Sequence, residues 1–375
     1  MGSRFLFFLL LASACAAQQP AVSDHDMSKM QHARTHDGFM QGGMHHAVAQ
    51  GVMLDAKSDQ ASHVITLRVG PMNLPASTLH MKMPQPPELV WTIPMTGWLL
   101  AYHPKLIDAA GNSVPGVVLH HVAFWNENRS DFLCPNKEEH IFGAGGELTD
   151  WAQIPGFGYR VEKRDQIRIE TMIHNPTTAF YKDVFLEILI PYLDDAAPAP
   201  VKNFYPAWMD VAGCGNSGYD LPAGPSKKVG SVPVKYSGIL LGVGGHMHDY
   251  AQQLTLEVSG VARSEVQPAE AENSRTEFAP ANKQVAVLPA KVDDQGHLLN
   301  IPVVTFFQTG GYPIASGIKL TVTATYNNPT GKLLRDGAMG IVVGYFVPQD
   351  LAALNSLRHP PSSSPEAHQP HSNQH

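Results

Sequence analysis

The sequence predicts an all-β protein built from two tandem, related β-sandwich domains of jelly-roll type, with disordered tails at both ends. Two observations support this fold class. Short runs of β-branched and aromatic residues are separated by Gly, Pro and Asn, while helical periodicity is scarce. In addition, one 20-residue pattern occurs twice along the chain.

The first 17 residues, MGSRFLFFLLLASACAA, predict a secretory signal peptide. A single Arg precedes an apolar stretch that is too short to span a bilayer, and small residues follow it. A weaker alternative is a bacterial lipoprotein whose lipidated first residue is Cys15. We therefore expect export to the periplasm or the cell exterior, with membrane attachment only if Cys15 is lipidated.

Two tails flank the expected strands. Residues 18–50 form a leader rich in His and Met, and residues 351–375 form a tail rich in His. Neither segment has strand or helix periodicity, so we expect both to be disordered. They are either merely solvated ends or loose ligands for a soft metal, because imidazole and thioether together suit copper better than magnesium or calcium.

The expected strands include HVITLRV, DVFLEILIPYL, QQLTLEV and GIVVGYF. The repeat is GYRVEKRDQIRIETMIHNPT from Gly158 and GYPIASGIKLTVTATYNNPT from Gly311, and each copy reads as a strand entering an Asn-Pro turn. His174 of the first copy stands opposite Asn327 of the second. We predict a domain over residues 51–200, an inter-domain connection over 201–235 and a second domain over 236–350.

Charge and cysteine content limit the function classes. The 375 residues carry a formal net charge of −7, which gives no basic field, so nucleic acid is not an expected partner. Export would leave Cys134 and Cys214 in an oxidising compartment, where they can form a disulfide. Their spacing in the sequence leaves that pairing open.

Adjacent histidines interrupt an apolar strand in the first domain. In VVLHHVAFWN, His120 and His121 should point to opposite faces of the strand, and an unpartnered ring in a core is costly. With His174 from the Asn-Pro turn, they offer three nitrogens to a metal at the rim of the strand. Each histidine alone is more simply a hydrogen-bonded core or surface residue.

The second domain contains GILLGVGGHMHDY, in which His246 and His248 project from one face of a strand. The neighbouring glycines leave room for a metal ion. Two exposed histidines on a strand face are the competing interpretation, and this motif alone does not decide between them.

Four motifs in order, LHHVAFW, RIETMIHNP, GGHMHDY and DGAMGIVVGYF, resemble the copper type II, ascorbate-dependent monooxygenases, which include peptidylglycine α-hydroxylating monooxygenase and dopamine β-monooxygenase. The resemblance covers roughly residues 83–348. It implies two β-sandwich domains and two copper ions per chain, with O2, a reductant such as ascorbate and a small-molecule substrate as partners.

The resemblance also implies two ligand sets. His120, His121 and His174 match the copper site that supplies an electron. His246, His248 and Met339 match the site where oxygen binds, and a thioether ligand favours copper(I) over zinc. Without the resemblance, the apolar strand pattern would predict that Met339 is a core methionine.

The substrate positions depart from the family pattern. Gly244 stands where peptide-amidating members have an arginine, and Ile341 and Val343 replace polar groups that contact substrate. The substrate pocket expected around these three residues therefore suits an uncharged molecule better than a peptidylglycine. The leading hypothesis is an exported copper monooxygenase that hydroxylates a C–H bond. The alternative is a non-catalytic protein for copper storage, delivery or sensing, and a zinc hydrolase is disfavoured by Met339.

Overall fold

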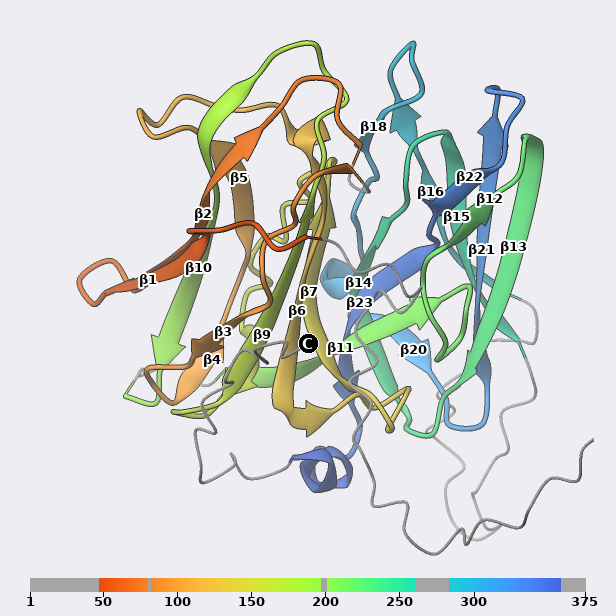
Figure 1. Ribbon diagram of the computed structural model, residues 1–375. Coiled ribbons are helices and arrows are strands. Elements are labelled where there is room, and N and C mark those ends of the chain that lie inside the picture. The colour runs from red at the N-terminus through yellow and green to blue at the C-terminus, as the bar shows by residue number, and fades with distance from the viewer. Residues whose placement is uncertain (1–46, 80–81, 197–200, 260–282, 359–375) are drawn as a thin grey trace, which may run out of the picture. The chain divides into compact units, whose positions relative to one another are not determined.

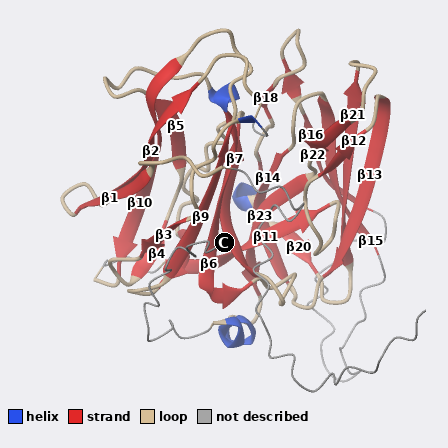
Figure 2. Cartoon of the chain, in the orientation of Figure 1, coloured by secondary structure: helices blue, strands red, loops and turns tan. Residues whose placement is uncertain are grey.

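The computed structural model describes residues 47–79, 82–196, 201–259 and 283–358, so the predicted signal peptide and most of both predicted tails lie outside the described residues. Strands dominate these residues, and the helices are short 3-10 turns, η3 (Gly116–Val118), η4 (Phe307–Thr309) and η5 (Ala352–Leu357) (Figure 2). The all-β prediction is confirmed. In the described ranges, no helix has the length and apolar character needed to cross a membrane.

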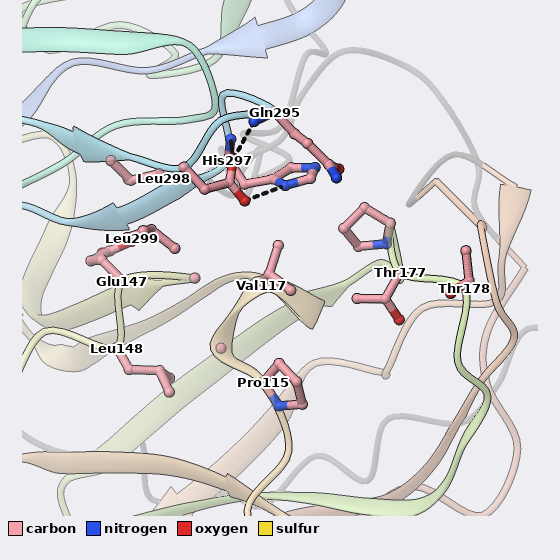
Figure 3. Close-up of a pocket in the computed structure, with 14 residues that line it drawn as sticks. Pro115, Val117, Glu147, Leu148, Thr177, Thr178, Gln295, His297, Leu298 and Leu299 are labelled. Carbon is pink, nitrogen blue, oxygen red and sulfur yellow. Dashed lines mark hydrogen bonds and ion pairs between the residues drawn. The ribbon is translucent and has the colours of Figure 1, made fainter.

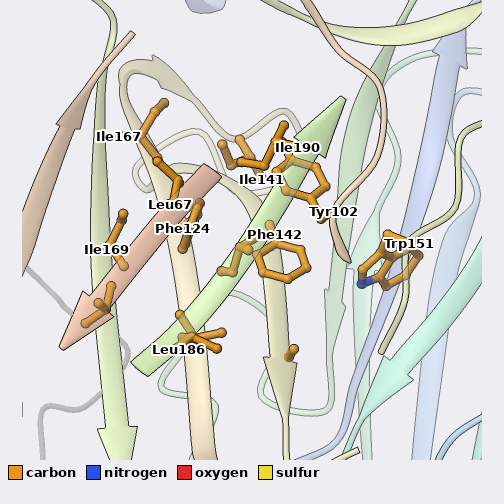
Figure 4. Packing of buried hydrophobic residues seen from close by; sticks show 14 of the residues in the cluster. Leu67, Tyr102, Phe124, Ile141, Phe142, Trp151, Ile167, Ile169, Leu186 and Ile190 are labelled. Atoms are coloured by element: carbon orange, nitrogen blue, oxygen red, sulfur yellow. The ribbon is translucent and has the colours of Figure 1, made fainter. Parts of the chain in front are cut away.

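Two sheets pack face to face in the N-terminal half (Figure 1). Leu67 and Leu186 of one sheet pack with Phe124 and Ile169 of the other in a single buried cluster (Figure 4). The first sheet contains β1 (Met53–Asp59), β2 (Val64–Leu74), β10 (Tyr181–Asp194), β4 (Gly97–Leu99) and β8 (Phe157–Val161), with β5 (His103–Ile107) paired to β10. The second sheet has the order β3 (Leu89–Thr92), β9 (Gln166–Ile173), β6 (Leu119–Ser130) and β7 (Glu138–Gly145).

The C-terminal half repeats this pattern around a second buried cluster. One four-stranded sheet has the order β13 (Gly224–Pro233), β21 (Lys319–Asn328), β15 (Ala251–Ser259) and β16 (Lys283–Pro289). The facing strands are β11 (Lys202–Asp210), β23 (Ile341–Pro348) and β14 (Gly238–His246), with β19 (Val304–Thr305) and β20 (Tyr312–Ile314) on β14. Two short pairs complete the half, β12 (Tyr219–Leu221) with β22 (Leu334–Ala338) and β17 (Lys291–Val292) with β18 (Leu298–Asn300).

The two copies of the sequence repeat occupy equivalent places. β9 lies between β3 and β6 in its sheet, and β21 lies between β13 and β15 in its own. The Asn-Pro-Thr turns also match in their hydrogen bonds, because Asn175 accepts from Thr177 in the first copy and Asn328 accepts from Thr330 in the second. Both asparagines are fully buried. The repeat therefore reflects one structural unit present twice.

Several contacts join the two halves. β8 and β11 pair in parallel, which makes one continuous eleven-stranded sheet. Cys134 and Cys214 form a disulfide with a Cα–Cα distance of 5.6 Å, so the pairing that the sequence left open is formed. Met339 and Ile341, from the second half, pack in the buried cluster of the first half. The segment that carries the predicted sulfur ligand therefore packs where the two halves meet.

Two segments are more ordered than the sequence indicated. Residues 201–235, read as a connection, contain β11, β12 and β13, so the proposed domain limits stay a prediction. The start of the predicted tail also folds, because Leu354 of η5 is buried and Arg358 pairs with Asp165 at 2.6 Å. Residues 351–358 of the predicted tail are thus held by contacts with the rest of the chain, and residues 359–375 lie outside the described residues.

Candidate metal centre

A β-bulge explains the adjacent histidines of β6. Leu119 pairs with Ile173 and His121 with Met172, so His120 is an extra residue in the register. Such a bulge re-aims a side chain that would otherwise point to the opposite face. The Nδ1 atoms of His120 and His121 consequently lie 3.1 Å apart. The two imidazoles can therefore face one ion, which a regular strand would prevent.

His174 joins this pair from the turn after β9. Its backbone N–H donates to the Val118 carbonyl at 3.1 Å, and its ring centroid lies 5.2 Å from that of His120. Burial is the main reason that the pKa of His174 falls to about 4. The ring is therefore neutral at pH 7, the form in which imidazole binds a metal.

The second half contributes His246 and His248 to the same cluster. His246 ends β14, where it pairs with Ile341, and His248 follows in the link to β15. The ring centroid of His248 lies 5.3 Å from that of His246 and 4.4 Å from that of His120. All five imidazoles thus form one continuous histidine cluster, in which ring nitrogens of His120, His121 and His248 lie within 4.8 Å of one another. These three residues could hold a metal ion.

Glu147 orients His246, and no pattern in the sequence pointed to this residue. Its Oε1 atom lies 3.1 Å from Nδ1 of His246 and accepts the backbone N–H of Gly145 at 2.8 Å. Burial opposes ionisation of Glu147, but its contacts with His246 and the backbone leave its pKa below the usual value. Among the described residues, the buried Nε2 of His246 has no hydrogen-bond partner. That nitrogen is in the state expected of a metal ligand whose other nitrogen is held by a carboxylate.

Tyr326 ties His248 to Met339. Its hydroxyl accepts the backbone N–H of His248 at 3.0 Å and that of Met339 at 3.1 Å, and it donates to the Met339 carbonyl. Burial raises the pKa of Tyr326 well above its usual value, so the hydroxyl keeps its proton. Two of the residues proposed from the sequence as ligands of one ion are therefore positioned by one side chain.

The Tyr326→Phe variant should lose copper(I) affinity at the set that contains His248 and Met339. Three buried backbone groups would lose their partner, at a cost of about 1–3 kcal/mol each, and both segments would shift. The measurement is copper(I) competition with a chelator, beside thermal unfolding. Tyr219→Phe is the matched control, because the Tyr219 ring packs edge-on at 6.4 Å from Tyr326 and its hydroxyl has no hydrogen-bond partner in the described structure. Equal copper(I) affinity in both variants would contradict the positioning role.

The residues of the predicted substrate pocket are closely packed. Ile341 is fully buried, and a Cβ on Gly244 would lie 2.8 Å from the Trp151 ring. Val343 lines a space of about 10 Å³ together with His121 and His246. This space is about large enough for one water molecule. A substrate pocket at these three residues stays a prediction.

Comparison with known proteins gives two curated relatives. The chain is 25% identical over 253 residues to "Probable copper-dependent oxygenase M1" of Phoma sp., covering 62% of this chain and 58% of that protein. It is 26% identical over 256 residues to "Probable copper-dependent oxygenase clz3" of Cochliobolus lunatus, covering 62% and 72%. The match thus spans less than two thirds of the first relative's length.

Other comparisons add little. No family model matches the chain. Among solved structures, PNGF-II matches 81% of this chain and 63% of its own, with a TM-score of 0.33 and 9% identity. A TM-score at this level supports no inference about fold or function.

Proposed function

We propose that this protein is an exported, copper-dependent monooxygenase that hydroxylates a C–H bond of a small molecule. The observation that carries the proposal is the histidine cluster, which draws ligands from β6, the turn after β9 and the end of β14. Both curated relatives are named as probable copper-dependent oxygenases, which supports copper and O2 as the cofactor and co-substrate. The disulfide is consistent with export.

The residues present fit copper. The buried Nε2 of His246 lacks a partner among the described residues while Glu147 holds its other nitrogen, and His174 is neutral. Imidazoles with a thioether form a donor set that suits copper better than magnesium or calcium. We assign His120, His121 and His174 to one ion and His246, His248 and Met339 to a second. Because the rings of His120 and His248 adjoin, these sets lie next to each other.

Copper held there would supply one-electron reduction and the activation of O2. The overall reaction consumes the substrate, O2, two electrons and two protons, and yields the hydroxylated product and water. A one-electron reductant such as ascorbate would supply the electrons. The protein's own groups bind and orient: Glu147 holds the His246 ring, Tyr326 holds His248 and Met339, and the buried setting limits access of bulk water.

Peptidylglycine is a poor candidate for the substrate. Gly244 offers no cation for a carboxylate, and Trp151 covers the place where a longer side chain would extend. An unpaired carboxylate in a dry site would cost several kcal/mol. An uncharged molecule is therefore the better candidate.

The test is substrate-dependent oxygen uptake by the copper-loaded full-length protein with ascorbate, over a panel of uncharged small molecules and one glycine-extended peptide. Oxygen-18 from labelled O2 should appear in a hydroxylated product, which separates turnover from oxidation of ascorbate by loose copper. The zinc-loaded protein is the control. Tight copper binding without any labelled product would instead favour a protein for copper storage, delivery or sensing.

A further inference from the structure

A cavity with a volume of about 560 Å³ lies beside the histidine cluster. Segments 115–117, 146–148 and 176–178 of the first half and 293–299 of the second half line it (Figure 3). Glu147 on its wall contacts His246, and Thr177 belongs to the turn that follows His174. A molecule in this cavity would therefore lie next to both predicted ligand sets.

Size favours this cavity over the space near Val343. The smaller space holds about 10 Å³, whereas pockets for organic ligands have volumes of about 300–1,000 Å³. Val117, Leu148, Leu298 and Leu299 give the larger cavity an apolar wall. A substrate with a substantial apolar body fits these dimensions and this surface.

The charges on the wall disfavour an anion. Among the described residues that line the cavity there is no Lys or Arg, while Glu147 and Asp293 are both acidic. Hydrogen bonds from His297 and the backbone outweigh partial burial and leave the pKa of Asp293 below its usual value, so this carboxylate is ionised at neutral pH. A carboxylate or phosphate on the substrate would meet the like charge of Asp293, with no Lys or Arg among the described lining residues to pair with it.

His297 provides a directed polar group in this apolar space. Its Nδ1 lies 2.9 Å from Oδ2 of Asp293, and its backbone N–H donates to the same carboxylate at 2.8 Å. An ionised carboxylate only accepts, so Nδ1 of His297 donates to it, and Nε2 is the ring nitrogen left to form a hydrogen bond with a ligand. Figure 3 shows the ring extending toward the Thr177 segment across the cavity.

We propose that this cavity binds the substrate as an uncharged, largely apolar molecule that carries a hydroxyl group, and that the hydroxyl forms a hydrogen bond with Nε2 of His297. This proposal rests on the proposed function only in that the bound molecule is then hydroxylated. Binding itself does not depend on that reaction. The site itself is defined by the apolar wall, the two carboxylates and the His297–Asp293 pair.

The experiment is equilibrium dialysis of the copper-free, full-length protein against three probes, 2-naphthol, naphthalene and 2-naphthoate. We expect 2-naphthol to bind best, naphthalene about two- to tenfold more weakly for want of the hydrogen bond, and 2-naphthoate at least about tenfold more weakly. In His297→Phe, 2-naphthol should fall to the level of naphthalene, while naphthalene binding is unchanged.

Two variants that fill the cavity from opposite walls, Thr178→Trp and Leu299→Trp, should each abolish binding of both neutral probes. Leu333→Trp, at an exposed position that does not line the cavity, is the matched control and should bind like the wild type. Tightest binding of 2-naphthoate, equal binding of 2-naphthol and naphthalene, no saturable binding, or binding that survives both filling variants would overturn the proposal.

These outcomes are separable from those of the oxygenase test. Loss of the expected probe pattern with labelled product still formed would overturn the substrate class alone. The expected probe pattern without labelled product from any substrate would overturn the oxygenase function and leave the cavity as a binding site.

Discussion

His248→Ala is expected to decrease substrate-dependent oxygen uptake by about 100-fold or more. Losing an outer-shell partner of a metal ligand typically costs about 10–100-fold, and losing a ligand itself should cost more. The ring of this buried residue adjoins both His120 and His246, so it connects the two ligand sets. Under the proposed function, removing it would take one donor from the copper ion that is expected to react with O2. Copper content should fall as well, measured on the dialysed, copper-loaded protein.

His103→Ala is the control for the loss of a histidine. His103 lies on β5 and pairs with Asp150 at 2.5 Å, outside the histidine cluster. Its replacement should leave copper content and oxygen uptake near the wild-type values. If His248→Ala behaved like this control, His248 would not be a ligand.

The second large effect is expected from Gly145→Ala. Gly145 ends β7 opposite His121, and a Cβ at this position would lie 2.9 Å from Nδ1 of His246 and 2.7 Å from Oε2 of Glu147. The methyl group would push the His246 ring away from the carboxylate that orients it. We expect copper affinity at the set with His246 to fall about 10–100-fold, as for loss of an outer-shell contact.

Gly146→Ala provides a neighbouring control. Its Cβ would meet only ordinary contacts, the nearest being 3.4 Å from the Gly116 carbonyl oxygen. Copper affinity, measured by chelator competition, should therefore stay near the wild-type value in this variant. Wild-type affinity in Gly145→Ala as well would show that the place of the His246 ring does not matter for metal binding.

Sequence patterns were sufficient for the fold class and for the repeat. Strand alternation depends on local burial, and the Asn-Pro-Thr turns recur because Asn175 and Asn328 each close the same hydrogen-bonded turn. The folded segment at 351–358 escaped prediction because it is held by tertiary contacts, namely the burial of Leu354 and the pairing of Arg358 with Asp165.

The candidate site was predictable only in part. The five histidines stand out in the sequence, and the structure brings their rings together. The bulge at His120 depends on the register with β9, so no local pattern reveals it. Glu147 contacts a histidine 99 residues later in the chain, and Tyr326 reads as an ordinary strand residue. Such positioning contacts arise from tertiary structure and leave no spacing signal.

Copper stoichiometry shows whether the histidine cluster holds two copper ions. The full-length protein and a variant with His120, His121 and His248 all replaced by alanine are loaded with copper, dialysed and analysed for metal. The histidine-rich and methionine-rich segments outside the described residues are the same in both proteins. The difference in copper content therefore comes from the cluster alone. We expect the variant to hold two fewer copper ions per chain. Equal copper in the two proteins, or a cluster that takes up zinc in preference to copper, would contradict it.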